Sequence, residues 1–137
     1  MAIVDETLAP LGGENESSYR RTIIPNNLTG SYVANDTDDH EFHVDARGKG
    51  RMTVVIENPS DKTVTTTVYG CHAIDDAVGD DGVMEIGGSG VSAFDTLTTE
   101  SNYECYNDPF PFYIVSCTSS AAPDGETVVV NITLQQQ

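Results

Sequence analysis

The sequence contains no tryptophan, and its 137 residues include 6 lysines and arginines against 22 aspartates and glutamates. The formal net charge of −16 repels phosphate backbones and anionic headgroups, so we expect no binding to nucleic acid or membranes. No apolar run approaches the roughly 20 residues of a membrane-spanning helix. The opening "MAIVDETLAPLGG" lacks the basic start and long apolar core of a secretory signal, which predicts a cytoplasmic location unless an assembly carries the chain out.

Motifs for common chemistry are also missing. Three cysteines, Cys71, Cys105 and Cys117, are too few and too far apart for a disulfide framework or a CxxC metal site, which favours free buried thiols over one bridge and an odd thiol. We find no GxSxG elbow, no phosphate-binding glycine loop and no HExxH pattern. We therefore predict a protein that is not an enzyme and that needs no cofactor.

The acids are spread over most of the chain rather than gathered in a tail. Aspartate exceeds glutamate by 13 to 9, and the chain has two lysines. This composition is similar to that of proteins from halophiles that keep molar salt in the cytoplasm, and the alternative is an ordinary acidic surface.

Short apolar and polar alternations fill the chain from residue 41 onward. "RMTVVIE" places Met52, Val54 and Ile56 on one face, and the Val- and Thr-rich run after "NPSDK" is predicted to form a hairpin with it. Seven to nine such strands predict an all-β protein, an antiparallel β-sandwich of Ig-like or jelly-roll-like type over residues 31–137. Residues 1 to about 21 lack this pattern, and residues 1–30 are predicted to be an extended N-terminal arm, which either reaches onto a neighbouring subunit or is a mobile terminus.

The arm and a proline-rich segment are the predicted contact surfaces. The segment "DPFPFYIVSCTSSAAPDG" holds an apolar strand between two turn signals, with prolines just before the strand. We expect subunit contacts from six residues, namely Leu8, Pro10, Leu11, Pro109, Phe110 and Pro111.

Two kinds of residue invite a metal-site interpretation. His40 and His43 are three apart, and in a strand this spacing puts the two rings on opposite faces, which disfavours joint chelation of zinc. The acidic loops "NDTDDH" and "DDAVGDDG" do not follow the EF-hand ligand series. Six loop aspartates remain weak cation-ligand candidates: Asp36, Asp38, Asp75, Asp76, Asp80 and Asp81.

The order of the stretches "MTVVIENPSDKTVTTTVYG" and "PFPFYIVSCTSSAAPDGETVVVNITL" resembles small β-sandwich accessory proteins of tailed viruses, which decorate the head or form turret or tail parts. The likeness covers about residues 51–134. With the acidic composition, it implies a virion structural protein of a virus with a haloarchaeal host. It also implies a homo-oligomer whose partners are other virion proteins, found in the virion and, during assembly, in the host cytoplasm.

A second hypothesis is a binding module of a halophile. In that case a β-sandwich would recognise a carbohydrate or a receptor through its acidic loops with the help of a cation.

Overall fold

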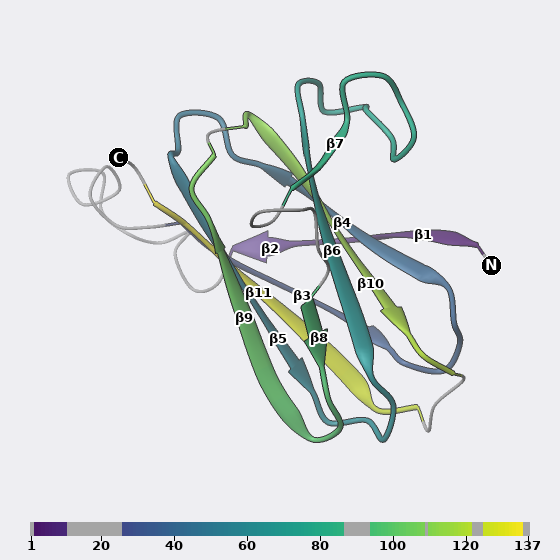
Figure 1. The fold of residues 1–137 in the computed structure, drawn as a ribbon. Helices are drawn as coiled ribbons and strands as arrows, with labels where there is room; N and C mark the ends of the chain where they lie inside the picture. The colour runs from purple at the N-terminus through teal and green to yellow at the C-terminus, as the bar shows by residue number, and fades with distance from the viewer. Residues whose placement is uncertain (1, 11–25, 87–93, 109, 122–124, 136–137) are drawn as a thin grey trace.

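The computed structural model describes residues 2–10, 26–86, 94–108, 110–121 and 125–135. In these residues the regular structure consists of β-strands, packed as two sheets that we call sheet A and sheet B (Figure 1). No helix in this part of the chain is long and apolar enough to cross a membrane. The predicted class, an all-β sandwich built mainly from antiparallel strands, is confirmed.

Sheet A has the strand order β1-β4-β10-β6-β7, and the short strand β8 pairs with another part of β6. All of its described pairs are antiparallel except β1 with β4, which is parallel. The strand bounds are β1 Ile3–Glu6, β4 Asp39–Asp45, β6 Val64–Cys71, β7 Met84–Ile86, β8 Phe94–Thr96 and β10 Phe112–Ser119.

Sheet B has the strand order β2-β3-β11-β5-β9, and every described pair in it is antiparallel. The strand bounds are β2 Ala9–Pro10, β3 Asn26–Val33, β5 Arg51–Asn58, β9 Glu100–Tyr106 and β11 Thr127–Gln135. The central strand, β11, alternates strictly between buried and half-buried residues after its first position, as its Val- and Thr-rich sequence predicts.

The core lies between the two sheets. Sheet B contributes the predicted face of β5 with Met52, Val54 and Ile56, and sheet A contributes Phe42 and Val115, all fully buried. β10 is buried on both faces. On the side away from the core, Ile114 and Phe112 pack with Cys71 under half-buried residues of the loop that follows β6. This explains the near-continuous apolar sequence of the strand.

The predicted hairpin between residues 51–57 and 63–70 is wrong. These residues form β5 and β6, which belong to different sheets, so the connection after Asn58 crosses from sheet B to sheet A. The buried Asn58 side chain stabilises this connection, because its Nδ2 donates to the backbone carbonyl oxygens of Lys62, Thr96 and Leu97. Alternating apolar residues on one face of each strand fit a hairpin within one sheet and a crossing between two sheets equally well. The sequence therefore does not distinguish the two arrangements.

The predicted division into an arm and a sandwich also differs from the structure. β1 pairs with β4 in sheet A, and β2 pairs with β3 in sheet B, so residues 3–10 join both layers of the same subunit (Figure 1). β3 itself begins at Asn26, before the predicted boundary. Residues 11–25 of the predicted arm lie outside the described residues.

Candidate functional site: two histidine centres on one strand

β4 carries two histidines whose side chains leave the strand on opposite faces. His40 is buried beside Tyr32 on the inner side, whereas His43 is on the outer side of sheet A and is about one-third exposed in its side chain. The expectation that the pair does not chelate one metal ion together is consistent with their contacts, because each ring meets a different pair of carboxylates. The alternation of β4 thus creates two separate centres.

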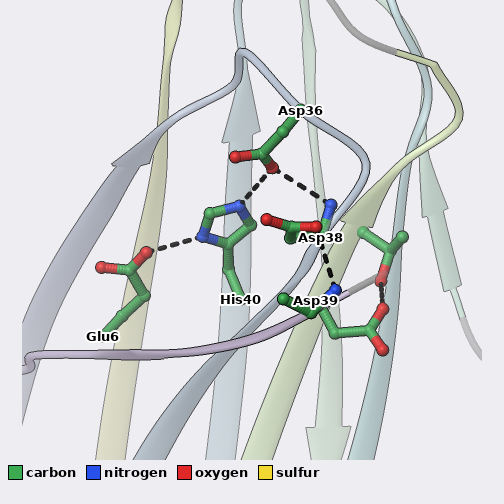
Figure 2. A network of polar contacts seen from close by, with 7 residues as sticks. Glu6, Asp36, Asp38, Asp39 and His40 are labelled. Carbon is green, nitrogen blue, oxygen red and sulfur yellow. Dashed lines mark hydrogen bonds and ion pairs between the residues drawn. The ribbon is translucent and has the colours of Figure 1, made fainter.

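The inner centre is a histidine held between two acids (Figure 2). His40 Nδ1 lies 2.6 Å from a carboxylate oxygen of Glu6, and its Nε2 lies 2.9 Å from one of Asp36. Both nitrogens can donate at once only when the imidazole is protonated. The ring also stacks on Tyr32 with centroids 4.0 Å apart and planes 11° from parallel. With 5% of the residue exposed, this geometry favours a structural role over contact with a substrate.

The loop before β4 extends this centre to the N-terminal residues. Asp36 also accepts from the backbone N–H of Asp38, and Asp38 accepts from the N–H of Ala2 (Figure 2). The N–H of Asp39 donates to the carbonyl of Ala2 at 2.9 Å. The hydrogen bond from His40 is the main cause that lowers the pKa of Asp36. These contacts together fasten β1 to the edge of sheet A.

The outer centre consists of Asp5, Glu41 and His43, which we call the outer-face triad. His43 Nε2 lies 3.3 Å from Oε1 of Glu41 and 3.5 Å from Oδ1 of Asp5. The Glu41 side chain is 6% exposed, and that of Asp5 is 80% exposed. Burial is the main cause that raises the pKa of Glu41. An imidazole nitrogen beside two carboxylates is a donor set that divalent transition metals accept.

The predicted loop aspartates serve mostly in local turns. Asp76 accepts from the N–H groups of His72 and Ala73, and Asp80 accepts from that of Ala77. Asp75 and Asp81 are exposed in the same loop, whereas Asp36 and Asp38 belong to the inner centre. Among the described residues, the one group of three potential ligands within 4.8 Å of one another is the outer-face triad, which includes none of these six.

The predicted subunit-contact residues are spread over two places. Leu8 is half-buried and packs against the core, and Pro10 pairs with Leu28 in sheet B. Phe110 also packs against the core, and the carbonyl of Pro111 accepts from Ala46. Leu11 and Pro109 lie outside the described residues. Contact with another subunit stays a prediction for all six.

Of the acids that surround the two histidines, sequence reasoning named Asp36 and missed Asp5, Glu6 and Glu41. Asp5 and Glu6 lie in a four-residue stretch too short to show alternation, and parallel pairing with a strand some 36 residues later leaves no local signal. Glu41 and His43 did carry a signal, because residues two apart in a strand share a face. Their spacing alone places a carboxylate and an imidazole side by side on β4.

The cysteines are free, as expected, but only two of the three are buried. Cys71 and Cys117 are enclosed, and burial raises their pKa values to about 11 and about 12. Such thiols stay protonated near neutral pH and react slowly. Cys105 is exposed on β9, against the expectation.

No family model matches the chain, and no curated protein matches it in sequence. Among solved structures, it is similar to the PliG periplasmic inhibitor of g-type lysozyme from Aeromonas hydrophila, with 16% identity, 99% and 98% of the two chains covered and a TM-score of 0.45. The Yersinia pseudotuberculosis-derived mitogen has 16% identity, coverage of 83% and 88%, and a TM-score of 0.49. The SPBc2 prophage-derived protein YomS has 16% identity, coverage of 82% and 96%, and a TM-score of 0.48. Likeness at this level carries no inference about function.

Proposed function

We propose that the chain is a structural protein of a virus particle, a β-sandwich subunit that forms a homo-oligomer and decorates or connects the capsid or tail of a tailed virus with a haloarchaeal host. The stretch that resembles such accessory proteins supplies the central strands β5, β6, β10 and β11, and this supports the proposal. The partners are other virion proteins. The chain is then located in the virion and, during assembly, in the host cytoplasm.

The observation that carries the proposal is the free side of β9 at the edge of sheet B. β9 pairs with β5 along one side, and no strand in the described part of the chain pairs with its other side. Tyr103 on this strand is 64% exposed. The strand contains no proline or lysine, which commonly protect such edges. A second copy of β9 fits this edge, because antiparallel pairing of two identical strands generates a two-fold interface.

The charge of the strand suggests the conditions under which pairing occurs. Glu100 and Glu104 lie on β9, so two copies bring four carboxylates close together. At an ionic strength of about 1 M the screening length falls to roughly 3 Å, which removes most of this repulsion. The proposed assembly is therefore one that forms in molar salt.

The test is the mass of the chain in molar potassium chloride, measured by analytical ultracentrifugation. We expect the wild type to form an oligomer and Tyr103→Lys to be monomeric, because the substitution removes the exposed aromatic ring that a partner strand would bury and puts a strongly hydrated side chain at the centre of β9. Ile74→Lys is the matched control, since Ile74 is also 64% exposed but lies in the loop after β6. A wild type that stays monomeric over a wide range of concentration, or equal behaviour of the two variants, contradicts the proposal.

Location in a particle needs a separate measurement. Mass spectrometry of gradient-purified particles from an infected haloarchaeal culture should detect the chain at a fixed ratio to the major capsid protein. Its loss from particles during purification, with the chain recovered only in the soluble fraction, contradicts a structural role in the virion.

The second candidate, a cation-assisted module that binds a carbohydrate or a receptor, has one supporting observation, the outer-face triad. Under that function a soluble glycan would bind a monomeric chain only when a cation is present.

A further inference from the structure

The outer-face triad brings two carboxylates, one of them buried, next to one imidazole nitrogen. We propose that Asp5, Glu41 and His43 bind one divalent transition-metal cation of the zinc class, through one oxygen of each carboxylate and Nε2 of His43. The site concerns one subunit and stands independently of the proposed virion function.

The backbone already places the three ligands together. Asp5 and Glu41 are directly opposite each other in the parallel pairing of β1 with β4, and His43 follows Glu41 on the same face. β4 is fixed on its other side by β10, so two of the three ligands come from a strand with hydrogen-bonded neighbours on both sides. The exposed Asp5 side chain has room to adjust.

The distances fit a coordination sphere. Charge-assisted N–H···O bonds measure about 2.7–2.9 Å, and the separations from His43 Nε2 to the two carboxylates exceed this, at 3.3 Å and 3.5 Å. In a tetrahedral zinc site with metal–ligand bonds of about 2.0–2.1 Å, adjacent ligand atoms lie about 3.3–3.4 Å apart. The two separations from His43 Nε2 are therefore close to the edges of such a tetrahedron.

The electrostatics favour a cation. The Glu41 side chain is 6% exposed, and the carboxylate of Asp5 meets the same nitrogen of His43. The site thus places two carboxylates beside one imidazole. A divalent cation bound between them would neutralise the negative charge of the two carboxylates.

The ligand types decide which cation fits. Calcium and magnesium take oxygen ligands almost exclusively, whereas an imidazole nitrogen with carboxylates suits zinc and its neighbours in the first transition row. Three protein ligands leave one tetrahedral position for water or for a group from a partner. Since Asp5 is on β1 and the other two ligands are on β4, a bound ion would join the N-terminal strand to sheet A.

The experiment titrates Zn²⁺ alone into the chelator-treated full chain in molar potassium nitrate, with a competing fluorescent indicator. We expect one equivalent to bind, with an affinity at least tenfold lower in His43→Gln and in Asp5→Asn. Asp5→Asn tests the site without loss of the fold, because this side chain is 80% exposed. Bound Co²⁺ should give the intense visible bands of a four-coordinate ion in the wild type and not in these variants.

The matched controls are His72→Gln and Asp61→Asn, which change an exposed histidine and an exposed aspartate elsewhere. Both should bind zinc as the wild type does. Binding that His43→Gln leaves unchanged would place the ion elsewhere on the chain, and the absence of stoichiometric binding would mean that the triad holds no metal; either result would overturn the proposal. Neither outcome depends on whether the chain oligomerises.

Discussion

Gly70 and Phe110 form a contact in which one residue makes space for the other. A Cβ atom at Gly70 would lie 2.5 Å from carbon atoms of the Phe110 ring, closer than packed side chains approach. The same ring meets His72 with centroids 5.8 Å apart and Tyr113 at 6.1 Å. Phe110 is therefore a packing residue of its own subunit, and any contact it makes with a neighbour uses only the part of the ring left exposed.

We predict that Gly70→Ala lowers the free energy of unfolding by about 1–3 kcal/mol, because the Phe110 ring must move to admit the methyl group. In a Phe110→Ala background the same substitution should cost much less, which chemical denaturation of the four variants measures as a double-mutant cycle. An equal cost in both backgrounds would show that the methyl group clashes with something other than this ring.

At the scale of elements, the position of β1 depends more on side-chain contacts than on its backbone hydrogen bonds to β4. It is four residues long and pairs along one side with β4. Short edge strands of this kind are weak unless other contacts hold them. The contacts of His40 with Glu6 and Asp36 supply this support, so the inner centre holds the N-terminal strand against sheet A.

We predict that His40→Gln lowers the free energy of unfolding by about 2–3 kcal/mol, because the imidazole that contacts both Glu6 and Asp36 is lost and Tyr32 loses a stacked ring. Hydrogen exchange followed by mass spectrometry should show faster exchange at residues 3–6 and unchanged protection in β11. His72→Gln is the control.

The pH dependence of the same variant gives a second check on this prediction. The pKa of Asp36 is lowered in the folded protein, chiefly by the hydrogen bond from His40, so its contribution to stability is present above the ordinary aspartate pKa. That contribution is lost as the pH falls through the lowered, folded-state value. The stability difference between the wild type and His40→Gln should therefore be largest near neutral pH and shrink in acid. A difference that grows in acid would contradict this account.

At the scale of the whole molecule, the net charge of −16 makes stability depend on salt. We predict that the free energy of unfolding rises by about 2 kcal/mol or more between 0.1 M and 2 M potassium chloride, which corresponds to roughly 6–10 °C in the melting midpoint. Sodium chloride should act equally, because screening does not distinguish the two cations. A flat response would mean that the carboxylates are spaced widely enough not to repel one another.

The sequence predicted the class of fold because alternation in strands such as β5 and β11 follows directly from burial on one face. It did not predict which strands pair, since the inward faces of β5 and β6 fit a hairpin and a crossing equally well. The candidate sites were largely missed. Both sites combine residues of β1 with residues of β4, which pair in parallel although they are far apart in the sequence. The segment "IVDE" is too short to show a periodicity that would reveal this pairing.

The position of β11 has a consequence for how the chain is made. Sheet B has β11 at its centre, where it supplies the hydrogen-bonded partners of both β3 and β5. As a ribosome releases the chain from its N-terminal end, those two strands emerge about 70 to 100 residues before the strand that joins them. Sheet B is thus completed only after Thr127–Gln135 has been synthesised, and until then nascent β3 and β5 lack the strand between them, although β2 and β9 are already available to pair with their other sides.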